Sequence, residues 1–349
     1  MIGKMVSVFL GFAIALLLIY TLINYLPSQS SFSIGNFLNS TQYNLTYPST
    51  TIQQSSLPQS QAVAYVLSLI NKDRMNYSLA NVTLSQITSG QQHAESMLQN
   101  NYFSHWDIYG MKPYMRYTLL GGNGSVDENV AWEFNSAGIN VIDALKQMEF
   151  NMMYRDQAEH NGHRDNILTG HHNQVSIGVA YNATTVYLVE DFIDSHISWF
   201  YDTPSYNNGT VKLQGTVAQN YSLSKNYGVQ ILYDPMITNL TPQQLHNAPY
   251  NGSYGYGNVT AGISYTSGGV SYSFKNFINI NATEYQVQGQ NFNIAFNMSK
   301  LIAQDGPGEY TVVVFLANGT NPNSNNVFYG ATYTIFINSN GQRYIPNNV

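Results

Sequence analysis

The 349-residue chain contains no cysteine, and charged residues make up only 9% of its composition. The absence of cysteine excludes disulfide frameworks, thiolate metal sites and cysteine nucleophiles, so packing must stabilise the fold. The 13 Lys and Arg residues form no run, and the net charge is −6. Such a chain offers no surface that would hold a phosphate backbone, and we expect no nucleic-acid partner.

Residues 5–26 form an apolar run that is long enough to cross a bilayer. Lys4 precedes the run and favours an N-terminus on the inside. No small-x-small cleavage site follows, which favours an uncleaved anchor over a signal peptide. We therefore predict a transmembrane anchor at residues 1–27, with the rest of the chain outside the cell membrane. Cleavage of this segment would instead make the protein secreted.

Residues 28–57 are mostly Ser, Gln, Asn and Thr and cannot bury enough surface to fold, so we expect a flexible polar stalk. About fourteen Asn-x-Ser/Thr sequons occur between Asn39 and Asn318. Sequons arise by chance in an Asn- and Thr-rich chain. Together with the anchor, they indicate a glycoprotein at the cell surface.

Apolar residues at helical spacing predict three helices in the next part of the chain, beginning near residue 60, at 85–100 and at 141–154. In the third, Glu149 falls on the apolar face and needs a partner there. Two alternating segments, 174–181 and 186–193, then predict a β-hairpin. This order of elements indicates an α+β domain over residues 58–198.

The remaining residues, 199–349, change character. Short alternating segments separated by Gly, Asn and Pro predict an all-β, immunoglobulin-like sandwich. No cluster of titratable residues is evident there, which favours a spacer or adhesive module. The predicted strands are 211–217, 229–233, 263–265, 270–274, 292–296, 310–316 and 333–337.

Five motifs in the first domain carry a family resemblance. They are His93-Ala94-Glu95-Ser96-Met97, Tyr102-Phe103-Ser104-His105, Glu128-Asn129-Val130-Ala131, Gly162-His163-Arg164-Asp165-Asn166-Ile167-Leu168 and Ile177-Gly178-Val179-Ala180. With these motifs in this order, the domain resembles the CAP superfamily, also called the SCP or PR-1 family, in its short prokaryotic type. The resemblance implies an α-β-α sandwich with a cleft lined by two histidines and two acids.

Carried onto this sequence, the resemblance implies His105 and His163 as the two histidines and Glu128 as the first acid. Glu149 is the expected second acid, although the tryptophan and tyrosine that normally frame it are absent; Glu159 is the fallback. Two neutral imidazoles can ligate zinc or another divalent cation, and two carboxylates can orient them or accept protons. The supporting residues are Ser104, Asn129, which is expected to hold a loop backbone, and Arg164, which is expected to pin the turn after His163.

Other histidines have simpler interpretations. His93 is expected to be a hydrogen-bonded structural residue, and His171 and His172 are expected to lie on the surface. No Gly-x-Ser-x-Gly elbow or His-Glu-x-x-His helix is present, so serine and zincin-type hydrolysis have no support.

The leading hypothesis is a non-enzymatic, extracytoplasmic protein that binds an unknown protein, glycan or lipid ligand and has a metal-capable cleft. One alternative is a metal-assisted hydrolase, peptidase-like, with Glu128 or Glu149 as general base. Another is a carrier of lipid or small apolar ligands.

Overall fold

Four strands form the sheet of the first half of the chain. In the computed structural model, which describes residues 57–201, 203–264 and 277–346, their order is β1-β3-β4-β2. β3 (Gln174–Tyr181) and β4 (Thr185–Asp194) form the predicted hairpin. β2 (Ser125–Phe134) pairs antiparallel with β4, and β1 (Thr83–Leu84) pairs parallel with β3 at the other edge.

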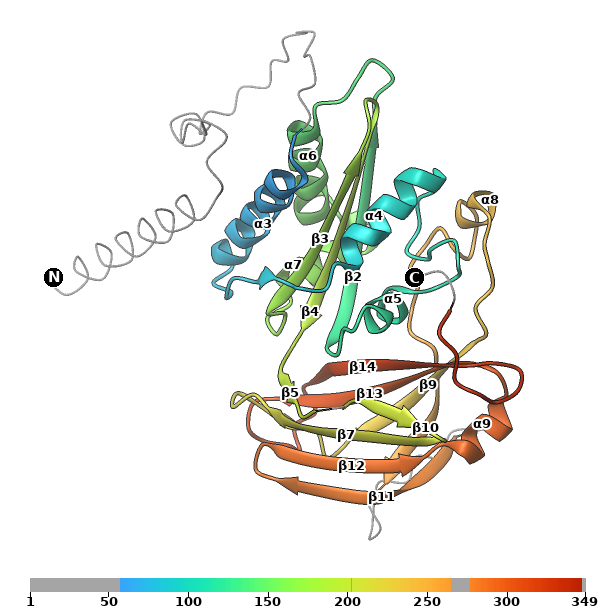
Figure 1. The fold of residues 1–349 in the computed structure, drawn as a ribbon. Helices are drawn as coiled ribbons and strands as arrows, with labels where there is room; N and C mark the ends of the chain where they lie inside the picture. Colours follow the sequence, from blue (N-terminus) through green and yellow to red (C-terminus); the bar gives the residue numbers. More distant parts are fainter. Residues whose placement is uncertain (1–56, 202, 265–276, 347–349) are drawn as a thin grey trace, which may run out of the picture. The chain divides into compact units, whose positions relative to one another are not determined.

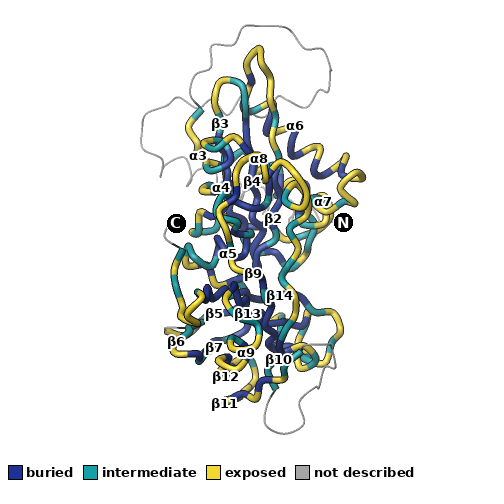
Figure 2. Tube along the Cα trace, turned by 90° about the vertical axis from the view of Figure 1, so that its right-hand side faces the viewer, coloured by how far each residue is buried: buried dark blue, intermediate teal, exposed yellow. Residues whose placement is uncertain are grey.

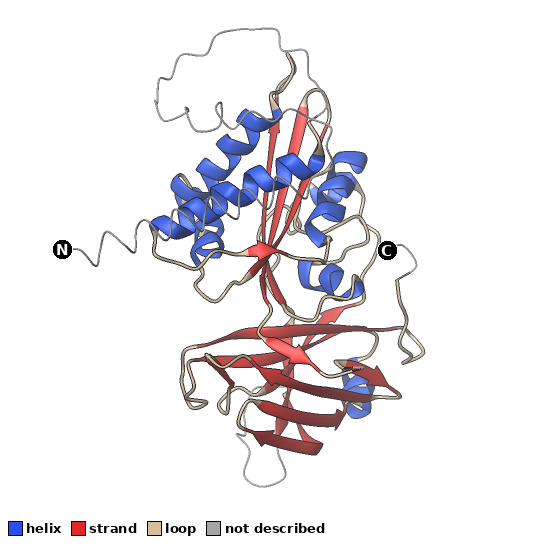
Figure 3. Cartoon of the chain, turned by 60° about the vertical axis from the view of Figure 1, so that its left-hand side comes forward, coloured by secondary structure: helices blue, strands red, loops and turns tan. Residues whose placement is uncertain are grey.

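Helices cover both faces of this sheet (Figure 1 and Figure 3). α3 (Gln59–Asn76), α6 (Val141–Tyr154) and α7 (Gly162–Leu168) share one apolar core with β3 and β4. α4 (Ser89–Asn100) packs on the opposite face. The first half is therefore a helix–sheet–helix arrangement, completed by the short helices α5 (Pro113–Leu119) and η1 (Gln157–Glu159).

Two details of the first half differ from the sequence prediction. The second helix begins at Ser89 rather than Ser85, because the amide of Ser85 donates to the Val175 carbonyl (2.9 Å) and so continues the pairing of β1 with β3. The strand β2, which runs through Asn129, was not predicted. The successive polar residues Glu128 and Asn129 had masked the alternation of that strand.

Arg74 near the end of α3 fixes the helix α7 that carries His163. Its guanidinium is fully buried and donates only to backbone carbonyls, those of Ala80, Ile167, Thr169 and His172, at 2.7 to 3.1 Å. A buried cation requires such partners. Arg74 therefore ties the end of α7 and the start of β3 to α3.

The second half begins where β4 ends at Asp194, since β5 (Ile197–Trp199) already belongs to another sheet. That sheet has the strand path β14-β13-β9-β10-β11-β12-β7-β5, and its strands enclose one apolar core. The other elements of this half are β6 (Ser205–Asn207), β7 (Thr210–Val217), β8 (Tyr221–Leu223), β9 (Val229–Pro235), α8 (Pro242–Leu245), β10 (Asn258–Ser264), β11 (Ile278–Gln288), β12 (Asn291–Asn297), α9 (Ser299–Asp305), β13 (Gly308–Asn318) and β14 (Val327–Ile337).

Most predicted strands of the second half are present, as β7, β9, β12, β13 and β14. β11 was missed because its exposed positions carry polar residues and few of its side chains are buried. The predicted strand at 270–274 lies outside the described residues. A parallel pairing of β10 with β11 joins the strands into one hydrogen-bonded path, so the immunoglobulin-like class remains a prediction.

The two halves pack against each other through aromatic and charged contacts. The Tyr114 and Tyr256 rings stack with centroids 4.7 Å apart, and the Tyr256 hydroxyl donates to the Val126 carbonyl (3.0 Å). Asp234 accepts from Lys112 Nζ (2.7 Å) and from the Tyr114 hydroxyl (2.5 Å). Figure 2 shows buried residues along β2 and β4 of one sheet and β13 and β14 of the other.

The predicted anchor at 1–27 and nearly all of the predicted stalk at 28–57 lie outside the described residues. Within the described part of the chain, no helix is both long and apolar enough to cross a membrane.

Candidate functional site

A cavity of about 460 Å³ brings together three polar clusters that are far apart in the sequence. One comes from the loop after α4, one from β2, and one from η1 and the start of α7. The sequence-predicted residues that line the cavity are Ser104, His105, Glu128, Asn129, Glu159 and His163.

His105 and Glu128 form the centre of this cavity. His105 Nδ1 lies 2.9 Å from Glu128 Oε1, and Arg116 donates to Glu128 Oε2 at 2.6 Å. Arg116 also donates to the His105 carbonyl at 2.8 Å and so holds the residue from both ends. Burial, together with the nearby charges of His163 and Arg116, lowers the pKa of His105 to about 3. His105 is therefore a neutral imidazole at physiological pH.

A second carboxyl group, that of Asp191, lies next to Glu128. Asp191 on β4 is in register with Glu128 on β2, both are buried, and the Ser89 hydroxyl donates to Asp191. Burial raises the pKa of Glu128 to about 7 against the opposing charge of Arg116, and burial and Glu128 raise the pKa of Asp191 well above its usual value. One arginine thus faces two carboxyls, and Asp191 keeps its proton.

His93 is structural, as the sequence indicated. Its Nε2 lies 2.8 Å from the Ser104 carbonyl and 4.0 Å from Glu128 Oε1. Ser104 also acts on the backbone: its hydroxyl accepts from the Trp106 amide (2.9 Å) and donates to the Tyr250 carbonyl (2.6 Å). Both residues therefore hold the loop that presents His105.

His163 is held by an acid that the sequence did not single out. Its Nδ1 lies 2.7 Å from Asp156 Oδ1, and the other Asp156 oxygen accepts from the Arg164 amide at 3.1 Å. Asn129 donates to the His163 carbonyl (3.1 Å) and accepts from the Asn166 side chain (2.9 Å). Asn129 thus holds the backbone of the first turn of α7 from β2.

Glu149 does not line this cavity. It is buried under the sheet, where its nearest titratable neighbour is Glu190 on β4. Burial and the charge of Glu190 raise the pKa of Glu149 well above its usual value, which favours the protonated form. The sequence correctly placed Glu149 on the apolar side of α6, but it is Glu159, the fallback, that lines the cavity.

Arg164 points away from the cavity. Its guanidinium donates to the Tyr77 hydroxyl (3.0 Å) and lies over the Tyr77 ring, 5.5 Å from the centroid. It therefore ties α7 to Tyr77, the residue that follows α3.

The second half of the chain supplies one wall of the cavity, between Asn251 and Tyr256. The Tyr254 ring lies 5.1 Å from the His105 ring, and Tyr256 stacks on Tyr114. No local pattern in the sequence indicated this wall, because the contact joins residues far apart in the chain.

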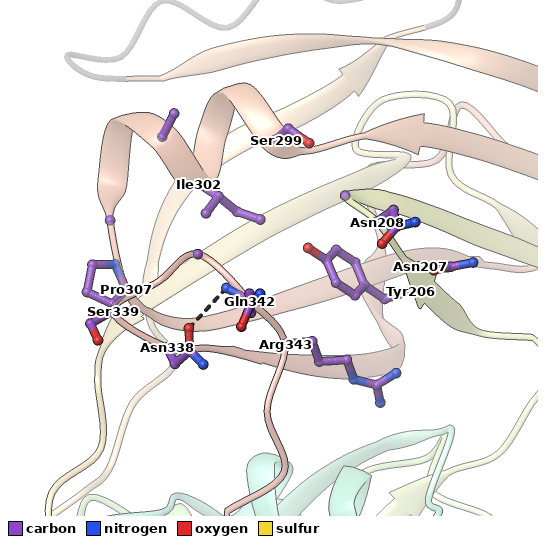
Figure 4. Close-up of a pocket in the computed structure, with 14 residues that line it drawn as sticks. Tyr206, Asn207, Asn208, Ser299, Ile302, Pro307, Asn338, Ser339, Gln342 and Arg343 are labelled. Atoms are coloured by element: carbon purple, nitrogen blue, oxygen red, sulfur yellow. Dashed lines mark hydrogen bonds between the residues drawn. The ribbon is translucent and has the colours of Figure 1, made fainter.

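A larger cavity, about 720 Å³, lies in the second half between α9, the β6–β7 turn and the turn after β14 (Figure 4). Arg343 is its one charged lining residue, and neither histidine nor a carboxylate lines it. Figure 4 shows the hydrogen bond from the Gln342 amide to Asn338 Oδ1 (3.0 Å) that closes its turn. Of these two cavities, the smaller one is lined by histidines and carboxylates.

No protein-family model matches the chain, nor does any curated protein sequence. Part of the chain is similar to solved SCP and CAP domains. One is an extracellular protein containing a SCP domain from Bacillus anthracis str. Ames, with 20% identity, a TM-score of 0.30, and coverage of 39% of this chain and 41% of that one.

The CAP domain of Enterococcal PrgA is 13% identical, with a TM-score of 0.30 and coverage of 45% of this chain and 69% of that one. An outer surface protein from Borrelia burgdorferi is 11% identical, with a TM-score of 0.29 and coverage of 39% and 96%. The chain thus spans less than half the length of the Bacillus protein. With TM-scores this low, the geometry of the site itself has to support a function.

Proposed function

We propose that this chain is an extracytoplasmic, membrane-anchored CAP-like protein whose cavity binds a ligand without hydrolysing it, and that a divalent cation is held at His105 and His163. The observation that carries the proposal is the pairing of each imidazole Nδ1 with a carboxylate, Glu128 or Asp156. A carboxylate on one nitrogen fixes the tautomer and leaves Nε2 as the ligand, which is the usual arrangement behind metal-binding histidines.

The donor set fits zinc. Two neutral imidazoles are ligands that zinc accepts, and the remaining positions would be filled by water or by a ligand in the cavity. Glu159 lines the same cavity and offers a carboxylate oxygen. Bound zinc would supply a Lewis acid, and the chain's own residues would orient the two imidazoles and shield them behind Tyr254.

Binding is favoured over hydrolysis because neither proposed general base is free. The two oxygens of Glu128 are held by His105 and Arg116, and Glu149 lies outside the cavity. A general base must reach the water that it deprotonates. The hydrolase alternative would therefore need another acid of the cavity lining, either Glu159, the remaining sequence-predicted candidate, or Asp127.

Lipid carriage is less favoured by the cavity. An apolar ligand needs an apolar groove, whereas the lining around His105 mixes histidines, acids and asparagines with Phe103, Val130, Tyr254 and Tyr256. An extracellular protein or a glycan fits this mixed lining better. The anchor at residues 1–27 and the stalk at 28–57 would present the site to such a partner at a distance from the membrane.

The test is zinc calorimetry on the full chain in detergent micelles, after chelation. We expect the double variant His105→Ala/His163→Ala to lose one molar equivalent of zinc, while His246→Ala, an exposed histidine outside the cavity, retains it. Unchanged stoichiometry in the double variant would contradict the proposal. A peptidase and esterase screen completes the test: activity that disappears in Glu159→Gln would establish the hydrolase alternative instead.

A further inference from the structure

Three histidines surround Asp194 at the end of β4, and none of these four residues lines the cavity just described. His171 Nδ1 lies 2.9 Å from both Asp194 oxygens, and His172 Nδ1 lies 3.1 Å from Oδ1. His196 Nε2 is 3.7 Å from the same oxygen. The sequence prediction that His171 and His172 lie on the surface was wrong for His172, which is 2% exposed, whereas the side chain of His171 is 25% exposed. Both rings converge on one carboxylate.

We propose that His171, His172 and Asp194 form a second metal site, which takes zinc through His171 Nδ1, His172 Nδ1 and one Asp194 oxygen. One possible ligand atom from each of the three residues lies within 4.8 Å of the other two. Zinc binds nitrogen and oxygen ligands at about 2.0–2.2 Å, so neighbouring ligands of a tetrahedral ion stand roughly 3.3 Å apart. The observed separations of 2.9 and 3.1 Å are close to that spacing.

The surroundings of His172 support metal ligation over a plain hydrogen bond. Its Nε2 is buried and has no hydrogen-bond partner, and Asp127 Oδ2 is 3.8 Å away. If Nδ1 only donated a hydrogen bond to Asp194, Nε2 would carry no proton, and its lone pair would face the Asp127 carboxylate without a hydrogen-bond donor. If Nδ1 bound a metal, Nε2 would carry the proton and point it at Asp127, which is the common arrangement behind a ligating histidine.

Contacts with neighbouring residues fix the positions of the His171 and His196 rings. The Phe328 ring from β14 stacks on His171 with centroids 4.1 Å apart and planes 14° apart. His196 Nε2 lies 2.6 Å from the His171 carbonyl and so holds its backbone instead of serving as a ligand. The fourth position of the metal is left for water, and entry is open beside His171, whose side chain is 25% exposed.

The site has a structural consequence because of its place in the fold. Asp194 ends β4 of the first sheet, and Phe328 belongs to the second. Ser125, which donates to Asp194 Oδ2 at 3.3 Å, also donates to the Tyr329 carbonyl. A bound ion would therefore stabilise the junction of the two halves, since metal binding to the folded state adds to its stability.

The experiment uses the full chain carrying His105→Ala/His163→Ala, so that zinc at the proposed cavity site is excluded. Calorimetry should still find one equivalent of zinc with micromolar or tighter affinity, and saturation should raise the Tm. Adding His171→Gln should weaken this binding at least tenfold and abolish the Tm shift. Adding His246→Ala should change neither. Cobalt in place of zinc should give visible bands that His171→Gln removes.

Absence of zinc binding in the His105→Ala/His163→Ala chain would overturn this proposal while leaving the cavity site untouched. Binding that persists in His171→Gln with unchanged affinity would also overturn it. Asp194→Asn is the isosteric second variant. Because His171 is half-buried, His171→Gln is expected to fold even where Asp194→Asn does not, and circular dichroism checks this.

Discussion

The two halves of the chain bury very different side chains. Around the first sheet the buried charged and titratable residues include Glu128, Asp191, Glu149, Glu190, Asp194, Arg74, Arg116, His93 and His172. Among the described residues of the second half after His196, the buried charged residues are Asp234 and Glu309. The interior of the first half holds many charged and titratable side chains, whereas the second half has a core of aliphatic and aromatic residues.

The two buried acids of the second half lie where it meets the first. Asp234 accepts from Lys112 and Tyr114, and Glu309 is in register with Asp234 across β13 and β9. The Tyr344 hydroxyl reaches Glu309 Oε1 at 3.4 Å. In the described part of the second half after His196, buried charge is therefore confined to the junction, and the core that its strands enclose is an apolar frame.

We expect the largest loss of stability from removal of Arg116 in the first half. In Arg116→Met, the buried Glu128 loses its cation, and the carbonyls of His105 and Met111 lose their donor. We expect the free energy of unfolding to fall by about 3–5 kcal/mol, because one partner of a buried pair is left alone. Denaturant unfolding of the full chain measures this. Arg155→Met, at an exposed arginine of the same half, is the control, and equal losses in the two variants would disprove the central role of Arg116.

Glu309 makes the stability of the second half sensitive to pH. Burial, with the charge of Asp234 adding to it, raises its pKa to about 8. The protonated form is favoured in the folded state, so its stability contribution is full below the unfolded pKa and is lost as pH rises through 8. Between pH 5 and pH 8, Glu309→Gln should gain on the order of 3 kcal/mol relative to the native chain. A difference that is independent of pH, in unfolding curves at the two values, would show that Glu309 titrates normally.

The sequence predicted the parts of this fold that depend on local patterns. The helix at 141–154 and the hairpin at 174–193 follow from the spacing of apolar residues, and the structure has both. His105, Glu128 and His163 were found because each lies in a recognisable motif. Local sequence patterns cannot show which side chains lie together in the folded sheet. Glu128 lies on the same side of the sheet as Asp191, whereas Glu149 faces Glu190.

Other site residues carried a signal that could have been used. Glu190 and Asp191 are consecutive acids inside the apolar strand β4, where neither can stay without a partner. Asp156 gave no such signal, because it lies among polar residues between α6 and α7. The wall around Tyr254 was beyond sequence reasoning, since it depends on how two distant segments pack.

The junction can be weakened on its own through Asp234. In Asp234→Asn, Lys112 loses its ion pair (2.7 Å) and Tyr114 loses a charged acceptor. We expect a loss of about 1.5–3 kcal/mol, the range for hydrogen bonds to charged groups. Because Asp234 also raises the pKa of Glu309, the pH dependence of stability should shrink in the same variant. An unchanged pH dependence would mean that the two acids do not interact.

Apolar packing should behave alike in both halves, which gives the smallest and sharpest comparison. Ile294 in the core of the second half and Ile177 under the first sheet are both buried on strands. Each Ile→Val change should cost about 0.5–1.5 kcal/mol at any pH, because it removes one methylene group and no charge. Unfolding curves at pH 5 and pH 8 measure both. If the stability loss in Ile177→Val alone depended on pH, the packing of Ile177 would be coupled to the titration of the buried acids. The difference between the polar first half and the apolar second half would then include their aliphatic packing as well.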